Sequence, residues 1–101
     1  MAEEPNQDQF KTTRARLTLP DAMARARRAM SGITDAPIDA VKGCAKDEAG
    51  NWIVTIDVVE RAARMGDNDL LSSYELISDP AGELLEFQRL RRYHRETGVD
   101  A

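Results

Sequence analysis

The sequence predicts an α+β fold in which one N-terminal helix packs on a three- to four-stranded antiparallel meander sheet. Apolar residues between Leu19 and Met30 recur at helical spacing, whereas after Gly32 they alternate with polar residues. Three short segments rich in Gly, Asp, Asn and Pro, namely DEAGN, MGDND and DPAG, separate the later apolar runs as turns would. A chain of 101 residues suits one small domain built from these elements.

The helix is expected over residues 19–31, within the segment TLPDAMARARRAMSG. Thr18 and Asp21 have the spacing of an N-terminal capping box, and Pro20 is tolerated in the first helical turn. The arginines of this segment mostly face outward, while its apolar side chains share one stripe. That stripe consists of Leu19, Ala22, Met23, Ala26, Ala29 and Met30.

Four runs after the helix have strand character. PIDAVKGCAKD at 37–47 is a weak strand, and WIVTIDVVERA at 52–62 is the strongest because it is dense in β-branched residues. LLSSYELIS at 70–78 and ELLEFQRLRRYHR at 83–95 follow, with DPAG as a tight hairpin turn between them. The sheet is therefore expected to span about residues 37–95.

We expect three parts along the chain: a disordered or partner-dependent arm at 1–16, a single α+β domain at 17–96, and a flexible tail at 97–101. The arm is polar, with Phe10 as the only large apolar side chain between Met1 and Leu17. The N-terminus predicts neither a signal peptide nor an anchor, and no apolar window approaches the length of a membrane span. The single cysteine, Cys44, cannot form an internal disulfide, so the expected location is the cytoplasm.

No pattern in the sequence predicts catalysis, a metal site or a cofactor site. The chain contains no phosphate-binding glycine loop and no HExxH or CxxC motif, and the acids of DNDLLSSYE do not have calcium-loop spacing. His94 is the only histidine and has no accompanying nucleophile motif. We therefore expect no enzymatic activity and no cofactor. The formal net charge of −4 argues against a general nucleic-acid binder.

Four arginines cluster in the segment RLRRYHR near the end of this acidic chain: Arg89, Arg91, Arg92 and Arg95. Residues 51–88 contain two arginines and eight acids, so a hairpin would place the last strand beside an acidic neighbour, where opposite charges attract. Internal charge complementarity is the first interpretation. A basic strip that binds another protein is the alternative, and a nucleic-acid site is the least favoured.

Both faces of the predicted sheet contain large apolar side chains, although the chain supplies only one obvious helix to cover them. We assign the helix to the side of Trp52, Ile56, Tyr74 and Phe87, which is richer in aromatic residues. The opposite side should then expose an apolar patch that binds a partner, unless the N-terminal arm or self-association covers it. The predicted partner-binding residues are Ile53, Val59, Leu71, Ile77, Leu84 and Leu90, with Arg89, Arg91, Arg92 and Arg95 along the margin.

Three blocks of the sequence, NWIVTIDVVE, DNDLLSSYEL and GELLEFQRLRRYHR, together resemble the gas vesicle protein O family (GvpO) over about residues 18–95. The first block matches through Trp52, Val54, Ile56, Asp57, Val58, Val59 and Glu60, and the second through Asp69, Leu71, Tyr74 and Glu75. The last block matches through Gly82, Glu83, Leu84, Phe87, Arg89, Arg92, Tyr93 and Arg95. The chain departs from the family in having RMGDND where many relatives have a proline-containing turn, and Asp57 where they have Glu.

The resemblance implies a non-enzymatic, cytoplasmic accessory protein for building gas vesicles, the hollow protein-walled buoyancy organelles of some microbes. Its implied partners are other gas vesicle accessory proteins and the shell protein, with a homodimer as a further option and with neither nucleic acid nor membrane as a partner. The helix-then-meander order also resembles a PepSY-type domain, so a peptide- or protease-binding module is the alternative function.

Overall fold

The computed structural model describes residues 16–101, which form one helix followed by four strands. The helix α2 spans Leu19–Met30, and the strands are β1 (Ile38–Lys46), β2 (Trp52–Arg61), β3 (Leu70–Ser78) and β4 (Leu84–His94). The predicted helix and all four predicted strands are confirmed close to their expected bounds. Except for Arg16, the predicted arm lies outside the described residues.

Helix α2 begins as its sequence predicts. The Thr18 side chain accepts a hydrogen bond from the Asp21 amide at 3.3 Å, and Pro20 lies in the first turn, where no amide donor is needed. Ala22, Ala26 and Met30 are buried on the inner stripe, whereas Leu19 remains exposed at the N-terminal end. The small alanine side chains let the helix backbone lie close to the sheet.

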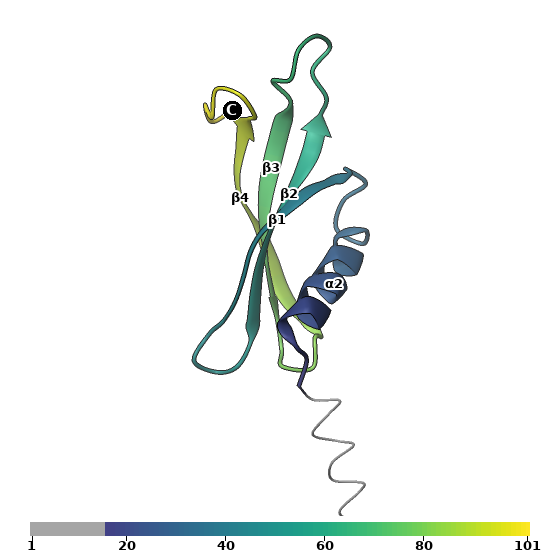
Figure 1. Ribbon diagram of the computed structural model, residues 1–101, viewed down its shortest axis with the longest axis vertical. Helices are drawn as coiled ribbons and strands as arrows, with labels where there is room; N and C mark the ends of the chain where they lie inside the picture. Colours follow the sequence, from purple (N-terminus) through teal and green to yellow (C-terminus); the bar gives the residue numbers. More distant parts are fainter. Residues whose placement is uncertain (1–15) are drawn as a thin grey trace, which may run out of the picture.

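The four strands form one antiparallel sheet in the order β1-β2-β3-β4, so each strand pairs with its neighbour in sequence. Short turns suffice for this meander, and Figure 1 shows the long, strongly twisted ribbon that results, with α2 lying against one side of it. The α+β class with an N-terminal helix on a meander sheet is therefore confirmed.

The core lies between α2 and the first strands of the sheet. Ala26 and Met30 of the helix contact a row of buried side chains, namely Val54, Ile56, Val58 and Leu76. The helix packs mainly on β1 and β2, so the same face of β4 lies beyond the helix. We call this covered side of the sheet the helix side and the other the open side.

The beginning of the helix contacts the turn between β3 and β4. The Leu17 amide donates to the Pro80 carbonyl at 3.3 Å. Gly82 has a φ of 94°, and a Cβ atom there would lie 2.6 Å from both Arg25 Cδ and Leu17 Cδ1. A glycine is therefore needed at this position both for its backbone conformation and for the close approach of the helix.

Residues after β4 turn back and run beside it. His94 and Arg92 make backbone hydrogen bonds with Val99 and Ala101, at 3.0 Å each, and Tyr93 forms a bridge with Asp100. The segment 97–101, which we expected to be a flexible tail, thus pairs with the outer edge of β4 at its C-terminal end.

Candidate interaction surface

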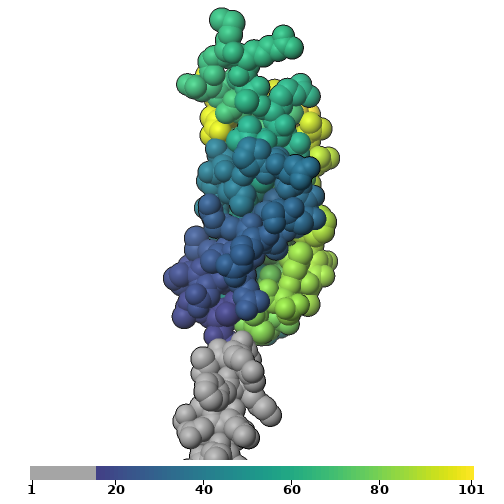
Figure 2. Space-filling view, turned by 90° about the vertical axis from the view of Figure 1, so that its right-hand side faces the viewer, coloured from purple at the N-terminus to yellow at the C-terminus, as the bar shows by residue number. Residues whose placement is uncertain are grey.

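The first part of β4 is exposed along its whole width. Every residue from Leu84 to Arg91 is exposed, which includes both faces of the strand. Four of its side chains are large and apolar: Leu84, Leu85, Phe87 and Leu90 are 37, 56, 49 and 48% exposed. Figure 2 shows this strand, in yellow-green, at the surface beside the helix. This concentration of exposed apolar groups on a single strand makes it the candidate interaction surface.

The structure distributes the six predicted apolar residues differently from our expectation. Ile53, Val59 and Ile77 lie on the open side but are only partly exposed, and Leu71 is 2% exposed, because it belongs to the core of that side. Leu71 lies directly opposite Val59 on β2 and Tyr93 on β4. The open side therefore does not present the continuous apolar patch that we predicted.

Two bulges in β4 account for the remaining two residues. Ser78 pairs with Leu84 and Ile77 pairs with Glu86, so Leu85 is an extra residue that has no partner on β3. Leu90 is an extra residue in the same way, between Arg89 and Arg91. Because Ser78 also pairs with Trp52, Leu84 lies on the helix side rather than the open side. The predicted placement of Leu84 was wrong for this reason, since strict alternation along β4 does not hold.

The bulge at Leu90 also separates the arginines. Arg91 lies opposite Ser73 on the open side, while Arg89 and Arg92 lie opposite Tyr74 and Ser72 on the helix side. Without the bulge, Arg89 and Arg91 would share a face. The four arginines therefore do not form one margin.

Two of the arginines have acidic partners within the fold. Arg95 contacts Asp39 at 2.8 Å and Asp69 at 3.1 Å, and Arg91 binds Asp100 at 2.5 Å while its guanidinium lies 4.2 Å from the centre of the Tyr93 ring. The hydrogen bonds that Arg95 donates to Asp39 and, with a smaller effect, to Asp69 raise the pKa of Arg95. The partners are thus acids of β1, the β2–β3 loop and the C-terminal segment rather than the acids within β3.

Arg89 and Arg92 differ from this pair. Within residues 16–101, neither forms an ion pair, and Nε of Arg92 is buried without a hydrogen-bond partner. Arg89 and Arg92 lie on the helix side of β4, as does Phe87, which is opposite Leu76. We call Leu84, Phe87, Arg89 and Arg92 the β4 strip.

A buried polar network on the open side was not predicted from the sequence. Asp57 is 1% exposed and accepts hydrogen bonds from the hydroxyls of Ser73, at 2.5 Å, and Tyr93. The bond to Asp57, followed by burial, raises the pKa of Tyr93 to about 12. The signal available in the sequence was an acidic residue in the middle of the most apolar strand, since a buried carboxylate requires donors.

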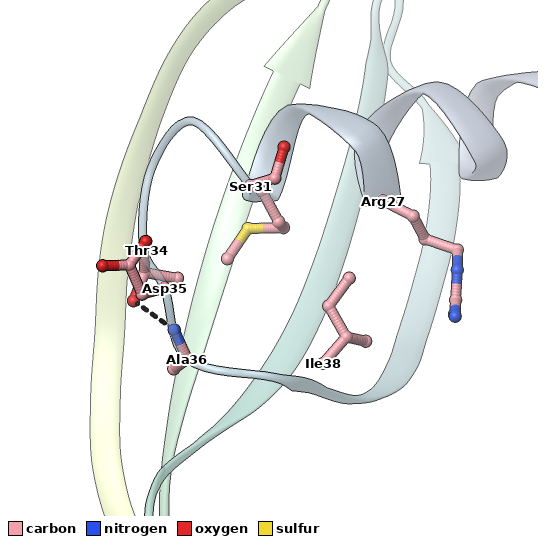
Figure 3. Close-up of a pocket in the computed structure, with 7 residues that line it drawn as sticks. Arg27, Ser31, Thr34, Asp35, Ala36 and Ile38 are labelled. Atoms are coloured by element: carbon pink, nitrogen blue, oxygen red, sulfur yellow. Dashed lines mark hydrogen bonds between the residues drawn. The ribbon is translucent and has the colours of Figure 1, made fainter.

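One pocket of about 240 Å³ lies at the end of the helix (Figure 3). Arg27 and Ser31 line it at the end of α2. Thr34, Asp35 and Ala36 line it from the following loop, and Ile38 lines it from β1. The Ala36 amide donates to the Thr34 hydroxyl at 3.1 Å, a local bond that shapes the loop. The charged side chains in the lining are Arg27 and Asp35.

The single cysteine, Cys44, is partly buried in β1. Burial raises the pKa of the Cys44 thiol, which disfavours the nucleophilic thiolate. Among residues 16–101, His, Cys, Asp and Glu side chains form no group of three that could hold a metal ion. In the same part of the chain, no helix is long and apolar enough to cross a membrane.

Comparison with known proteins finds matches to the family of gas vesicle protein O. The family model described as "Gas vesicle synthesis protein GvpO" matches residues 5–98. Gas vesicle protein O1 of Halobacterium salinarum is 30% identical over 78 residues, which cover 77% of this chain and 65% of that protein. Gas vesicle protein O of Haloferax mediterranei is 32% identical over 80 residues, covering 76% and 55% respectively.

A third relative, gas vesicle protein O of a Streptomyces species, is 33% identical over 66 residues, covering 65% of this chain and 51% of that protein. The chain thus spans about half to two thirds of the length of these relatives. No solved structure matches it. The resemblance of the three strand blocks is confirmed, and the chain belongs to the gas vesicle synthesis protein GvpO family.

Proposed function

We propose that this protein is a non-enzymatic accessory protein of gas vesicle assembly, which works in the cytoplasm by binding other gas vesicle accessory proteins or the shell protein. The observation that carries the proposal is the family match over residues 5–98, together with relatives whose names describe them as gas vesicle proteins.

The β4 strip is the surface through which we propose this binding. Phe87 and Leu84 are 49 and 37% exposed, so burying them against a partner would supply apolar contact area. Arg89 and Arg92, which form no ion pair within residues 16–101, would orient an acidic partner. Leu19, 46% exposed at the start of α2, is a further exposed apolar group on the helix.

This surface replaces part of the one predicted from the sequence. Leu84, Arg89 and Arg92 remain in it. Leu71 is left out because it is buried, and Arg91 and Arg95 because acidic residues of the same chain already bind them. Ile53, Val59 and Ile77, which are partly exposed on the open side, form a separate and more weakly supported candidate surface.

The test is capture of purified gas vesicle accessory proteins and of the shell protein by this immobilised chain. Phe87→Ser and Arg89→Glu should each reduce capture severalfold without unfolding the domain, because both side chains are exposed. Arg28→Glu, which reverses an exposed charge on the outer face of α2, is the matched control and should capture normally.

Two outcomes of the capture experiment would contradict the proposal. Failure of the unmodified chain to capture any of these proteins would remove the proposed function. Normal capture by both β4 variants, with loss in an Ile53→Asp and Ile77→Asp double variant that remains folded, would move the binding surface to the open side.

A further inference from the structure

The described residues begin beside the start of β4. The Leu17 amide donates to the Pro80 carbonyl at 3.3 Å, in the turn that leads into β4, and the Leu17 side chain lies against Gly82. Figure 2 shows the same arrangement, with the start of the helix in purple next to β4 in yellow-green. Residues 1–15, which precede this point, are therefore attached at one end of the β4 strip.

With increasing distance from this point, the β4 strip is first apolar and then basic. The exposed Leu84 and Phe87 come first, and Arg89 and Arg92 follow. All four lie on the helix side of the sheet, whereas α2 packs mainly on β1 and β2. Within residues 16–101, the two arginines form no ion pair. The strip therefore fits a segment that has an apolar side chain near the attachment point and acids farther from it.

Residues 1–15 contain their side chains in this order. From Leu17 backward along the chain, the aromatic Phe10 comes first, and three acids follow it: Asp8, Glu4 and Glu3. The basic residues of the segment all lie between Phe10 and Leu17, on the side away from the acids. A segment that runs along the strip therefore brings its acids, and not its basic residues, to the two arginines.

The segment is also long enough to reach the whole strip. An extended chain advances about 3.3 Å per residue, so Phe10 can lie up to roughly 23 Å from Leu17, whereas Phe87 is about 17 Å from Gly82 along β4. The acids begin two residues beyond Phe10, where a reach of roughly 30 Å extends past Arg89, about 23 Å along the strand. The family match begins at residue 5, so most of this segment belongs to the region that the family model covers.

We propose that residues 1–15 fold back over the β4 strip of the same chain and run antiparallel to β4. Phe10 packs against the apolar half of the strip, and the three acids lie beside its basic half. Burial of the apolar side chains stabilises the contact, and the short tether keeps the local concentration of the segment high. The segment then competes with a partner for this surface. That consequence rests on the proposed function, whereas the contact itself does not.

A nitroxide label on the segment tests the contact in the full chain. The label is attached to Gln7→Cys in a Cys44→Ala background, and the loss of each backbone amide signal is measured by NMR. The amides of residues 87–92 should lose most of their intensity. The β1–β2 turn is the matched control surface, because it lies at the same end of the sheet: an added Cβ at Gly50 would be 3.7 Å from Pro80 Cγ. Its amides should keep their intensity.

Two variants of the segment test which side chains hold it. Phe10→Ser removes the apolar contact, and Asp8→Lys places a like charge beside the arginines, so each should restore part of the lost intensity at residues 87–92. Asp67→Lys reverses an exposed acid in the β2–β3 loop, at the other end of the sheet, and should leave the loss of signal unchanged.

Three results would overturn the proposal. Equal loss of signal at the strip and at the β1–β2 turn would show that the segment does not bind the strip. A loss that Phe10→Ser and Asp8→Lys both leave unchanged would show that these side chains do not make the contact. An equal loss when the nitroxide and the isotope label are on different chains in a mixture would show that a second copy supplies the segment. Because capture of gas vesicle proteins is measured separately, failure of this contact and failure of the proposed function are distinguishable.

Discussion

Asp57 shows how one residue determines the interior of the open side. Its carboxylate is buried and accepts hydrogen bonds from Ser73 and Tyr93, which lie on two different strands. Charged hydrogen bonds of this kind stabilise more than neutral ones, and a buried donor left without its acceptor is costly. The network therefore ties β2, β3 and β4 together at one level of the sheet.

We expect Asp57→Ala to reduce the free energy of unfolding by about 1–3 kcal/mol, because two hydroxyl donors lose their acceptor. Tyr93→Phe should reduce the free energy of unfolding by about 1–2 kcal/mol, since it removes one hydroxyl donor but keeps the aromatic ring. Urea unfolding monitored by Trp52 fluorescence measures both. A double variant whose loss equals the sum of the single losses would show that the two groups do not act through one hydrogen bond.

Tyr93 also predicts a dependence of stability on alkaline pH. Its pKa is raised from 10.0 in an unperturbed tyrosine to about 12 in the fold, chiefly by the hydrogen bond to Asp57. A raised pKa contributes stability that is complete below pH 10 and is lost as pH rises toward about 12. The wild type should therefore lose stability over this range, measured by urea unfolding, and the Tyr93→Phe variant should lose less.

Asp69 predicts the opposite dependence at acid pH. The hydrogen bond from the Ala63 amide and the contact with Arg95 hold its pKa below the ordinary value of 3.8. A lowered pKa contributes stability that is present above pH 3.8 and is lost as pH falls through the value in the fold. Acid unfolding of Asp69→Asn should show a weaker dependence on pH in this range than the wild type.

At the scale of the elements, the turn between β3 and β4 is the most constrained local feature. Gly82→Ala should destabilise the fold by about 1–3 kcal/mol, because the position has a positive φ and a Cβ atom would collide with Leu17 and Arg25. Gly43→Ala is the matched control. No atom lies within 4 Å of its added Cβ, so the midpoint temperature of thermal unfolding should change little or rise slightly. Equal effects at the two glycines would contradict this account.

The elements themselves could be predicted from the sequence because each has a strong periodic pattern and clear turn residues on both sides. The bulges in β4 could not, since Leu85 and Leu90 are leucines without any local signal for an extra residue. A one-residue insertion reverses the faces of everything that follows it. For this reason the surface predicted from alternation assigned Leu84 wrongly and placed Arg89 and Arg91 together.

The burial of Leu71 could not be predicted from the local sequence pattern, for a different reason. Alternation identified its face correctly, but not the contacts that cover it. Leu71 of β3 is directly opposite Tyr93, which lies near the far end of β4. Burial of this kind depends on which strands are neighbours, and that is a property of the whole sheet rather than of one strand.

For the whole molecule, we expect no tight binding to nucleic acid. The net charge is −4, two of the four clustered arginines are bound to acids of the same chain, and the other two lie on the opposite face. An electrophoretic mobility shift with random duplex and single strands at physiological salt should show no complex. A tight complex that weakens steeply with added salt would contradict this expectation.

The contact of Leu17 with Pro80 and Gly82 has a consequence for the order of folding events. The three hairpins join neighbouring segments, but this contact closes a loop that includes nearly the whole sheet, and such closures are slow because their entropic cost comes first. A nascent chain lacks this docking site until the last hairpin has left the ribosome. In hydrogen exchange, the amides at the beginning of α2 should accordingly open more often than those of β2, through local fraying rather than global unfolding.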